Sequence, residues 1–145
     1  CSIFDCINKE AIPNVSVLPS NVNLAAAEIE LNGIDKKEFI LKNEVDFVKD
    51  DYDFIIIDCP PSLSMLTINA MTTADSVLVP IQCEFYALEG LSQLMNTIRL
   101  VKKKLNADIS IDGVVLTMRD SRSNLGKQVA EEIRKFMERR KRTNE

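Results

Sequence analysis

The sequence predicts an α/β fold in which helices cover both faces of a parallel β-sheet. Four short β-type runs alternate with helical patterns along the 145 residues. Three of these runs are nearly continuous in Val, Ile and Leu, which is typical of strands that are covered on both faces. With 46% hydrophobic residues, the chain is long and apolar enough to bury the core of one domain.

The predicted elements follow one another in an alternating order. The strands are expected at residues 15–18, 54–58, 76–81 and 111–117, and the helices at residues 23–31, 35–48, 87–105 and 124–140. In the last two helices, apolar residues recur every three or four positions, as they do on one face of a helix. Strands that alternate with helices in this way favour a parallel sheet with crossover connections.

Charge is distributed unevenly along the chain. Residues 1–98 carry 5 basic and 15 acidic side chains, whereas residues 99–145 carry 13 basic and 7 acidic ones. A basic C-terminal third on an acidic protein is suited to a polyanion, and solvated helix faces are the alternative explanation. The four cysteines lack the paired spacing of metal ligands, and there is no histidine. We expect reduced, mostly buried cysteines in a cytosolic protein, with a disulfide framework as the alternative.

The run FIIIDCPPS, residues 54–62, reaches an aspartate and then two prolines. Ligands of parallel sheets bind beyond the carboxyl ends of the strands, and one carboxylate there can hold Mg²⁺ through water beside a nucleotide's phosphates. Pro60 and Pro61 fix φ and remove two amide donors, so the loop after Asp58 has a restricted path. An aspartate that only caps or turns the end of a strand explains the same nine residues. Residues 80–84 and 118–120 lie at the ends of the next two predicted strands. We expect these two loops and the loop after Asp58 to lie together at the carboxyl edge of the sheet.

The sequence contains no glycine-rich phosphate loop. Such loops need glycine because backbone amides must approach the phosphates closely, and the four glycines, Gly33, Gly90, Gly113 and Gly126, are well separated. Residues 121–128, SRSNLGKQ, include Gly-Lys but lack the first glycine and the final hydroxyl residue of the pattern. We interpret them as a helix start with Ser123 or Asn124 as the cap.

Two longer motifs, DCPPSLSMLT and EFYALEGL, resemble the ParA/Soj family of chromosome- and plasmid-partitioning ATPases. The resemblance covers about residues 3–137 and includes VLPSNVNLAAAEIEL upstream and IDGVVLTMRDSRSNLGKQVAEEIRKF downstream. It implies a P-loop NTPase-like fold, here incomplete, because the family's glycine-rich Walker A loop would precede Cys1. Residues 1–145 are interpreted as a single, partial ATPase domain, with a basic tail at about residues 138–145 that does not resemble the family.

The resemblance also implies roles for individual residues. Asp58 matches the Walker B aspartate, which positions Mg²⁺ and its water beside ATP. Cys59, Pro60, Pro61 and Ser62 match the second switch, which senses the γ-phosphate near the dimer interface. Met118, Arg119 and Asp120 match a loop that passes near the nucleotide base. Candidate DNA contacts, for which a solvated helix face is the alternative, are Lys102, Lys103, Lys104, Arg119, Arg122 and Arg134, with the basic residues 139–142.

From this resemblance, we expect a cytoplasmic, nucleoid-associated bacterial ATPase. It is expected to bind ATP and Mg²⁺, to dimerise, to bind DNA non-specifically and to respond to a ParB/Spo0J-type centromere-binding partner, without a membrane contact. Because the phosphate loop is absent from the sequence, we expect the chain alone to be inactive as an ATPase. One alternative is a non-catalytic remnant that acts as an interaction module. Another is a MinD-like division-site positioning ATPase. Proteins of that kind bind the membrane through the apolar face of a C-terminal helix, and the tail of this sequence lacks such a face.

Overall fold

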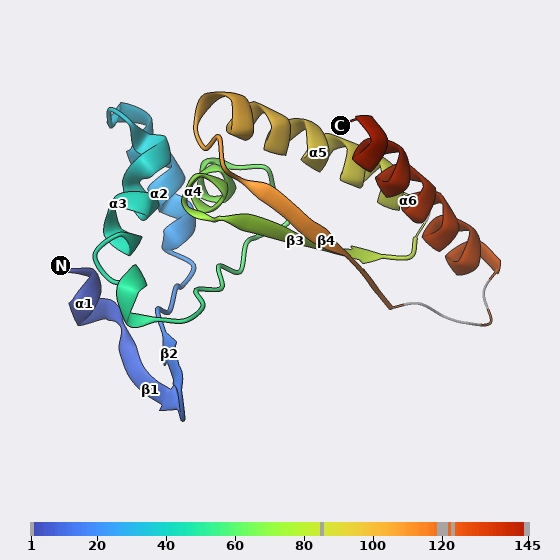
Figure 1. The fold of residues 1–145 in the computed structure, drawn as a ribbon. Coiled ribbons are helices and arrows are strands. Elements are labelled where there is room, and N and C mark those ends of the chain that lie inside the picture. Colours follow the sequence, from blue (N-terminus) through green and yellow to red (C-terminus); the bar gives the residue numbers. More distant parts are fainter. Residues whose placement is uncertain (1, 85, 119–121, 123, 144–145) are drawn as a thin grey trace. The chain divides into compact units, whose positions relative to one another are not determined.

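The computed structural model describes residues 2–84, 86–118, 122 and 124–143 of the chain, which divides into two units (Figure 1). Unit 1 comprises residues 1–74 and unit 2 comprises residues 75–145. Helices and strands are mixed, with a parallel strand pair in unit 2, and this confirms the predicted α/β class. Within the described ranges, no helix is both long and apolar enough to cross a membrane.

Unit 2 is built around two parallel strands, β3 (Ser76–Gln82) and β4 (Ser110–Thr117). Parallel strands need a crossover of a dozen or more residues, and α5 (Ala87–Lys104) supplies it. After β4 comes α6 (Asn124–Thr143), and both helices lie over the same side of the strands (Figure 1). All four elements were predicted from the sequence within a few residues of their observed bounds.

The core of unit 2 forms where alternate residues of β3 meet the apolar stripes of α5 and α6. It consists of Val79, Ile81, Leu91, Met95, Val129 and Ile133. Leu91 and Met95 lie about one helical turn apart and are 2% and 1% exposed, respectively. On the other side of the strands, Leu78 and Val115 are 59% and 44% exposed. The buried positions of unit 2 therefore follow the periodicity of its sequence.

Unit 1 consists of short elements. The helix α1 (Ile3–Cys6) precedes an antiparallel hairpin of β1 (Asn8–Ile12) and β2 (Val15–Val17). Asn14 in the hairpin turn has a φ of 64°, a left-handed conformation that asparagine tolerates better than most residues. The remaining elements are α2 (Leu24–Glu30), the 3₁₀ helices η1 (Leu31–Gly33), η2 (Lys37–Phe39) and η3 (Lys49–Asp51), α3 (Ile40–Val45) and α4 (Met65–Thr73). The helix predicted over residues 35–48 is therefore divided into η2, α3 and turns.

Residues 54–58 do not form a strand, so that prediction is wrong. The described part of the chain contains only the β1–β2 and β3–β4 pairs, and no segment forms a ladder with residues 54–58. A strand needs a hydrogen-bonded neighbour. The expected burial is also absent, since Phe54 and Ile56 are 87% and 92% exposed.

The cysteines are less buried than expected. Cys83 is buried, but Cys6 and Cys59 are exposed, and none of these three is in a disulfide. The reduced state stays a prediction, and the prediction that most cysteines are buried is wrong.

The sequence analysis missed β1 and α4. The buried residues of α4 are Thr67, Asn69, Ala70, Met71 and Thr72. Because they extend around much of the helix, α4 lacks the wide polar face whose periodicity marks a surface helix. The hydroxyls of Thr72 and Thr73 donate to the carbonyl oxygens of Ile68 and Asn69 in the same helix, which gives each of these polar groups a partner within α4.

Leu91→Ala should lower the free energy of unfolding by about 2–5 kcal/mol, because it removes a buried side chain and leaves a cavity. Leu100 lies on the same helix but is 57% exposed, so Leu100→Ala is the matched control and should change the stability by about 0.5 kcal/mol at most. Urea denaturation followed by circular dichroism measures both variants. Equal losses of stability would contradict the packing of α5.

Candidate functional site

Asp58 lies between η3 and α4, in a segment without regular secondary structure. The residue is exposed, and no hydrogen bond or ion pair from the described residues reaches its carboxylate. An exposed and unpaired carboxylate is available to a hydrated cation. The predicted Walker B residue therefore has an accessible side chain.

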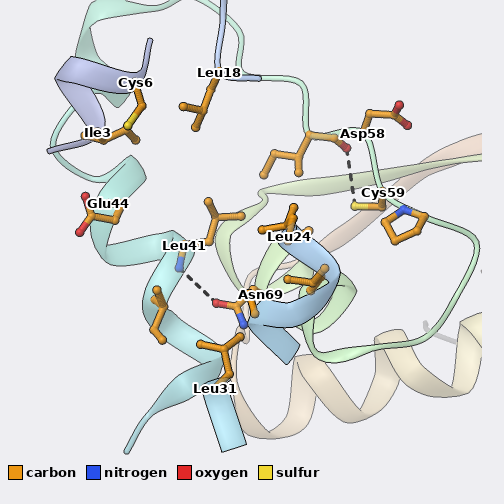
Figure 2. Close-up of a pocket in the computed structure, with 16 residues that line it drawn as sticks. Ile3, Cys6, Leu18, Leu24, Leu31, Leu41, Glu44, Asp58, Cys59 and Asn69 are labelled. Carbon is orange, nitrogen blue, oxygen red and sulfur yellow. Dashed lines mark hydrogen bonds between the residues drawn. The ribbon is translucent and has the colours of Figure 1, made fainter. Parts of the chain in front are cut away.

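A cavity of about 420 Å³ in unit 1 has Asp58 at its rim (Figure 2). Its wall is mainly apolar and includes Ile3, Leu18, Leu24, Leu31, Leu41 and Leu66. Figure 2 shows the Asp58 carboxylate directed away from the cavity. Since an apolar wall cannot compensate a buried phosphate charge, the cavity itself is not suited to nucleotide phosphates. The outward side of Asp58 is the side that can meet a hydrated ion.

The candidate switch segment, residues 59–62, follows Asp58 and is exposed. Although Cys59 as a whole is exposed, it also lines the cavity, and its Sγ lies 3.7 Å from the carbonyl oxygen of Ile57. Partial burial raises the pKa of the Cys59 thiol, and the negative charge of Asp58 raises this pKa further. The thiol is therefore protonated at neutral pH and is a poor candidate for a thiolate nucleophile or metal ligand.

Two residues that the sequence analysis missed, Thr67 and Asn69, lie on α4 next to the switch segment. They are 6% and 5% exposed. Thr67 Oγ1 donates to the carbonyl oxygen of Ser62 over 2.6 Å, and Asn69 Oδ1 accepts from the backbone N–H of Leu41 over 3.1 Å (Figure 2). The signal in the sequence was the presence of polar residues inside the apolar stretch MLTINAM, because buried polar groups need partners.

The protein offers a magnesium ion one carboxylate here and not a full set of ligands. Within the described ranges, no group of three or more His, Cys, Asp or Glu side chains could hold a metal. Mg²⁺ in nucleotide sites usually keeps several waters and takes other ligands from the phosphates, so one carboxylate is sufficient. The exposed, unpaired Asp58 fits a water-mediated contact of this kind.

In unit 2, the ends of β3 and β4 bring two predicted loops to one edge. Gln82 and Thr117 are partners in the parallel register, so Cys83 and Met118 follow the strands at the same edge. Met118 is 81% exposed with a φ of 50°, which is strained for a residue other than Gly, Asn or Asp. Arg119 and Asp120 lie outside the described residues. Because Asp58 belongs to unit 1, the meeting of all three loops stays a prediction.

The basic candidates lie on or next to α5 and α6. Lys102, Lys103 and Lys104 are exposed in the last turn of α5, where cations complement the helix dipole. Lys102 Nζ also donates to the carbonyl oxygen of Ile109 over 3.0 Å, which stabilises the turn into β4. Arg122 and Arg134 are exposed before and along α6.

Comparison with known proteins identifies the family. A family model described as an AAA domain, AAA_31, matches residues 1–111. The sporulation initiation inhibitor protein Soj of Bacillus subtilis is 56% identical over 134 residues, which cover 92% of this chain and 53% of Soj. The chromosome partitioning protein ParA of Myxococcus xanthus is 52% identical over 134 residues, covering 92% of this chain and 47% of that protein. The chain belongs to the ParA/Soj family of partitioning ATPases. It spans about half the length of these relatives.

The fold is shared with a protein whose solved structure contains an ATP analog. Cobyrinic acid a,c-diamide synthase from Mycobacterium smegmatis, with a bound ATP analog and magnesium, matches with a TM-score of 0.84 and 34% sequence identity. The match covers 93% of this chain and 55% of that one. The same enzyme is also known with bound ADP and magnesium. These matches confirm the P-loop NTPase-like α/β fold that the sequence predicts.

Asp58→Asn should lower the pKa of Cys59, because it removes a negative charge that disfavours the thiolate. Burial still raises this pKa in the variant, so we expect alkylation by iodoacetamide at pH 8 to accelerate by only about two- to fivefold. Mass spectrometry of the Cys59 peptide measures the rate, and Cys6 in the same chain is the internal reference. If the ratio of the Cys59 rate to the Cys6 rate did not change, Asp58 would have no charge effect on the thiol.

Proposed function

We propose that this chain forms the magnesium-positioning part of the nucleotide site in a ParA/Soj-type partitioning ATPase. The observation that carries the proposal is the 56% identity to Soj across 92% of the chain. ATP and Mg²⁺ are the proposed cofactors, supported by the magnesium and ATP analog bound to the M. smegmatis neighbour. The exposed carboxylate of Asp58, which no described residue bonds, supports its role as the residue that holds a water of the ion.

When bound, Mg²⁺ neutralises charge on the β- and γ-phosphates. Asp58 orients the ion through a water molecule, and the switch segment contacts the terminal phosphate. Because Pro60 and Pro61 have no backbone N–H, the backbone donors of this segment are the amides of Cys59 and Ser62. Two amides on a stiff backbone make a selective contact, because the backbone cannot move these amides to reach a phosphate that lies in a different position. The 145 residues contain no glycine-rich loop, so we expect the chain alone to lack ATPase activity.

We further propose that the whole protein acts as an ATP-bound dimer on non-specific DNA and that a ParB/Spo0J-type partner stimulates hydrolysis. The place of action is the cytoplasm, at the nucleoid. Family membership supports this proposal, and so does the excess of basic residues after residue 98. Lys103, Lys104, Arg122 and Arg134 are exposed in unit 2 and can contact phosphates without reading bases.

Asp58→Asn tests the proposal in the protein as expressed from its own gene. We expect ATP turnover to fall by on the order of 100-fold, because the ion loses its positioning carboxylate. Asp53→Asn changes another exposed carboxylate of unit 1 and should leave turnover near wild type. Phosphate release at saturating ATP and Mg²⁺ measures both. Full activity of the Asp58 variant would exclude the assigned role, and a wild-type protein without any turnover would exclude the ATPase proposal.

A further inference from the structure

We propose that Thr67 is a positioning residue that fixes the C-terminal end of the switch segment to α4. The inference rests on the proposed function of residues 59–62 as the segment that contacts the terminal phosphate. It concerns a residue that does not touch the nucleotide in this proposal and acts only through the carbonyl group of Ser62.

The hydroxyl of Thr67 differs from the other threonine hydroxyls near it. Those of Thr72 and Thr73 donate to carbonyl oxygens four residues earlier, inside α4, as helical threonines commonly do. Thr67 instead donates to Ser62, five residues earlier and outside the helix, over 2.6 Å. Thr67 is 6% exposed, so the hydroxyl end of this bond is shielded from water, whereas Ser62 at its other end is exposed. The bond therefore joins a loop to a helix and does not merely satisfy a hydroxyl.

The N-terminus of α4 lacks an ordinary side-chain cap, which increases the importance of Thr67. Ser64 occupies the N-cap position but makes no capping hydrogen bond. Its Oγ is buried and has no partner among the residues that the structure describes. Thr67 is three residues further on, and its bond to Ser62 links a side chain in the first turn of α4 to the preceding loop.

The hydrogen bonds of Asn69 hold α4 in place, so that a bond from Thr67 can position the loop. Its Nδ2 donates to the carbonyl oxygens of Lys37 over 2.9 Å and Met65 over 3.1 Å, and its Oδ1 accepts from the N–H of Leu41 over 3.1 Å. The residue is 5% exposed, and breaking any of these bonds would leave a buried polar group unpaired. The position of α4 relative to residues 37–41 is thereby set, and Thr67 extends this constraint to Ser62.

The switch segment is consequently stiff in its middle and held at its end. Pro60 and Pro61 restrict φ, and the Thr67 bond limits the positions of Ser62. A segment that is pre-organised in this way pays little ordering entropy when it contacts a phosphate. Without the hydroxyl of Thr67, the segment should move more and distinguish a triphosphate from a diphosphate less well.

The first test uses Thr67→Val in the 145-residue chain, with Cys59 as a local reporter of the switch segment. Because Cys59 lies partly against the cavity wall, a looser segment should expose its thiol more often. We expect iodoacetamide to modify Cys59 about threefold faster or more, relative to Cys6. Thr67→Ser retains the hydroxyl and should restore the wild-type rate. Thr72→Val removes a hydroxyl that is 0% exposed but bonds within α4, so it is the matched control.

An unchanged Cys59 rate in Thr67→Val would overturn the inference, as would an equal increase in Thr72→Val, which would indicate general loosening of α4. Circular dichroism verifies that each variant is folded. The second test measures the affinities of the protein expressed from its own gene for a Mg²⁺-bound ATP analogue and for Mg²⁺-bound ADP. Thr67→Val should lower the ratio of the two affinities, and an unchanged ratio would also overturn the inference. A wild-type protein that binds neither nucleotide would instead refute the proposed function, while the alkylation result would still decide the role of Thr67.

Discussion

The buried side-chain amide of Asn69 is the interaction on which the arrangement of unit 1 depends. It bonds to the backbone at Lys37 and Leu41, 32 and 28 residues earlier in the chain, and so fixes α4 against a distant segment. Each unmade bond of a buried amide costs about 1–3 kcal/mol, so alternative positions of α4 are strongly disfavoured. Because Thr67 is two residues before Asn69 on the same helix and bonds to Ser62, the end of the switch segment depends on this anchor as well. A structural hydrogen-bond network thus supports the loop that carries the proposed chemistry.

Unit 2 is organised by a different force, the burial of apolar surface. Leu91 and Met95 of α5 and Ile133 of α6 pack against alternate residues of β3, and the burial of such side chains contributes about 1.5–3 kcal/mol each. The parallel register that pairs Gln82 with Thr117 then brings the following loops to one edge. The exposed faces of the helices retain the basic residues, and the same packing therefore leaves cations accessible to a polyanion.

The elements that were predictable from the sequence are those whose burial follows a simple period. The two strands and two long helices of unit 2 have such patterns, and their bounds were close to those observed. Residues 54–58 were misassigned because an apolar run does not reveal whether a neighbouring strand is present. The helix α4 was missed because its buried residues include Thr67, Asn69 and Thr72, which obscure the expected apolar stripe. For the site, the motif around Asp58 was sufficient to select the candidate residues. The partner of the Thr67 hydroxyl was not predictable, because it depends on the path of the preceding loop.

Asp58 connects these observations to function, since it precedes the switch segment and leaves its carboxylate exposed at the rim of an apolar cavity. A crystal structure of the protein expressed from its own gene, with Mg²⁺ and an ATP analogue, tests its role most directly. We expect a carboxylate oxygen of Asp58 to accept a hydrogen bond from a water ligand of the ion, at roughly 4 Å from the metal. A magnesium ion whose ligands and water shell are complete without Asp58 would contradict this role.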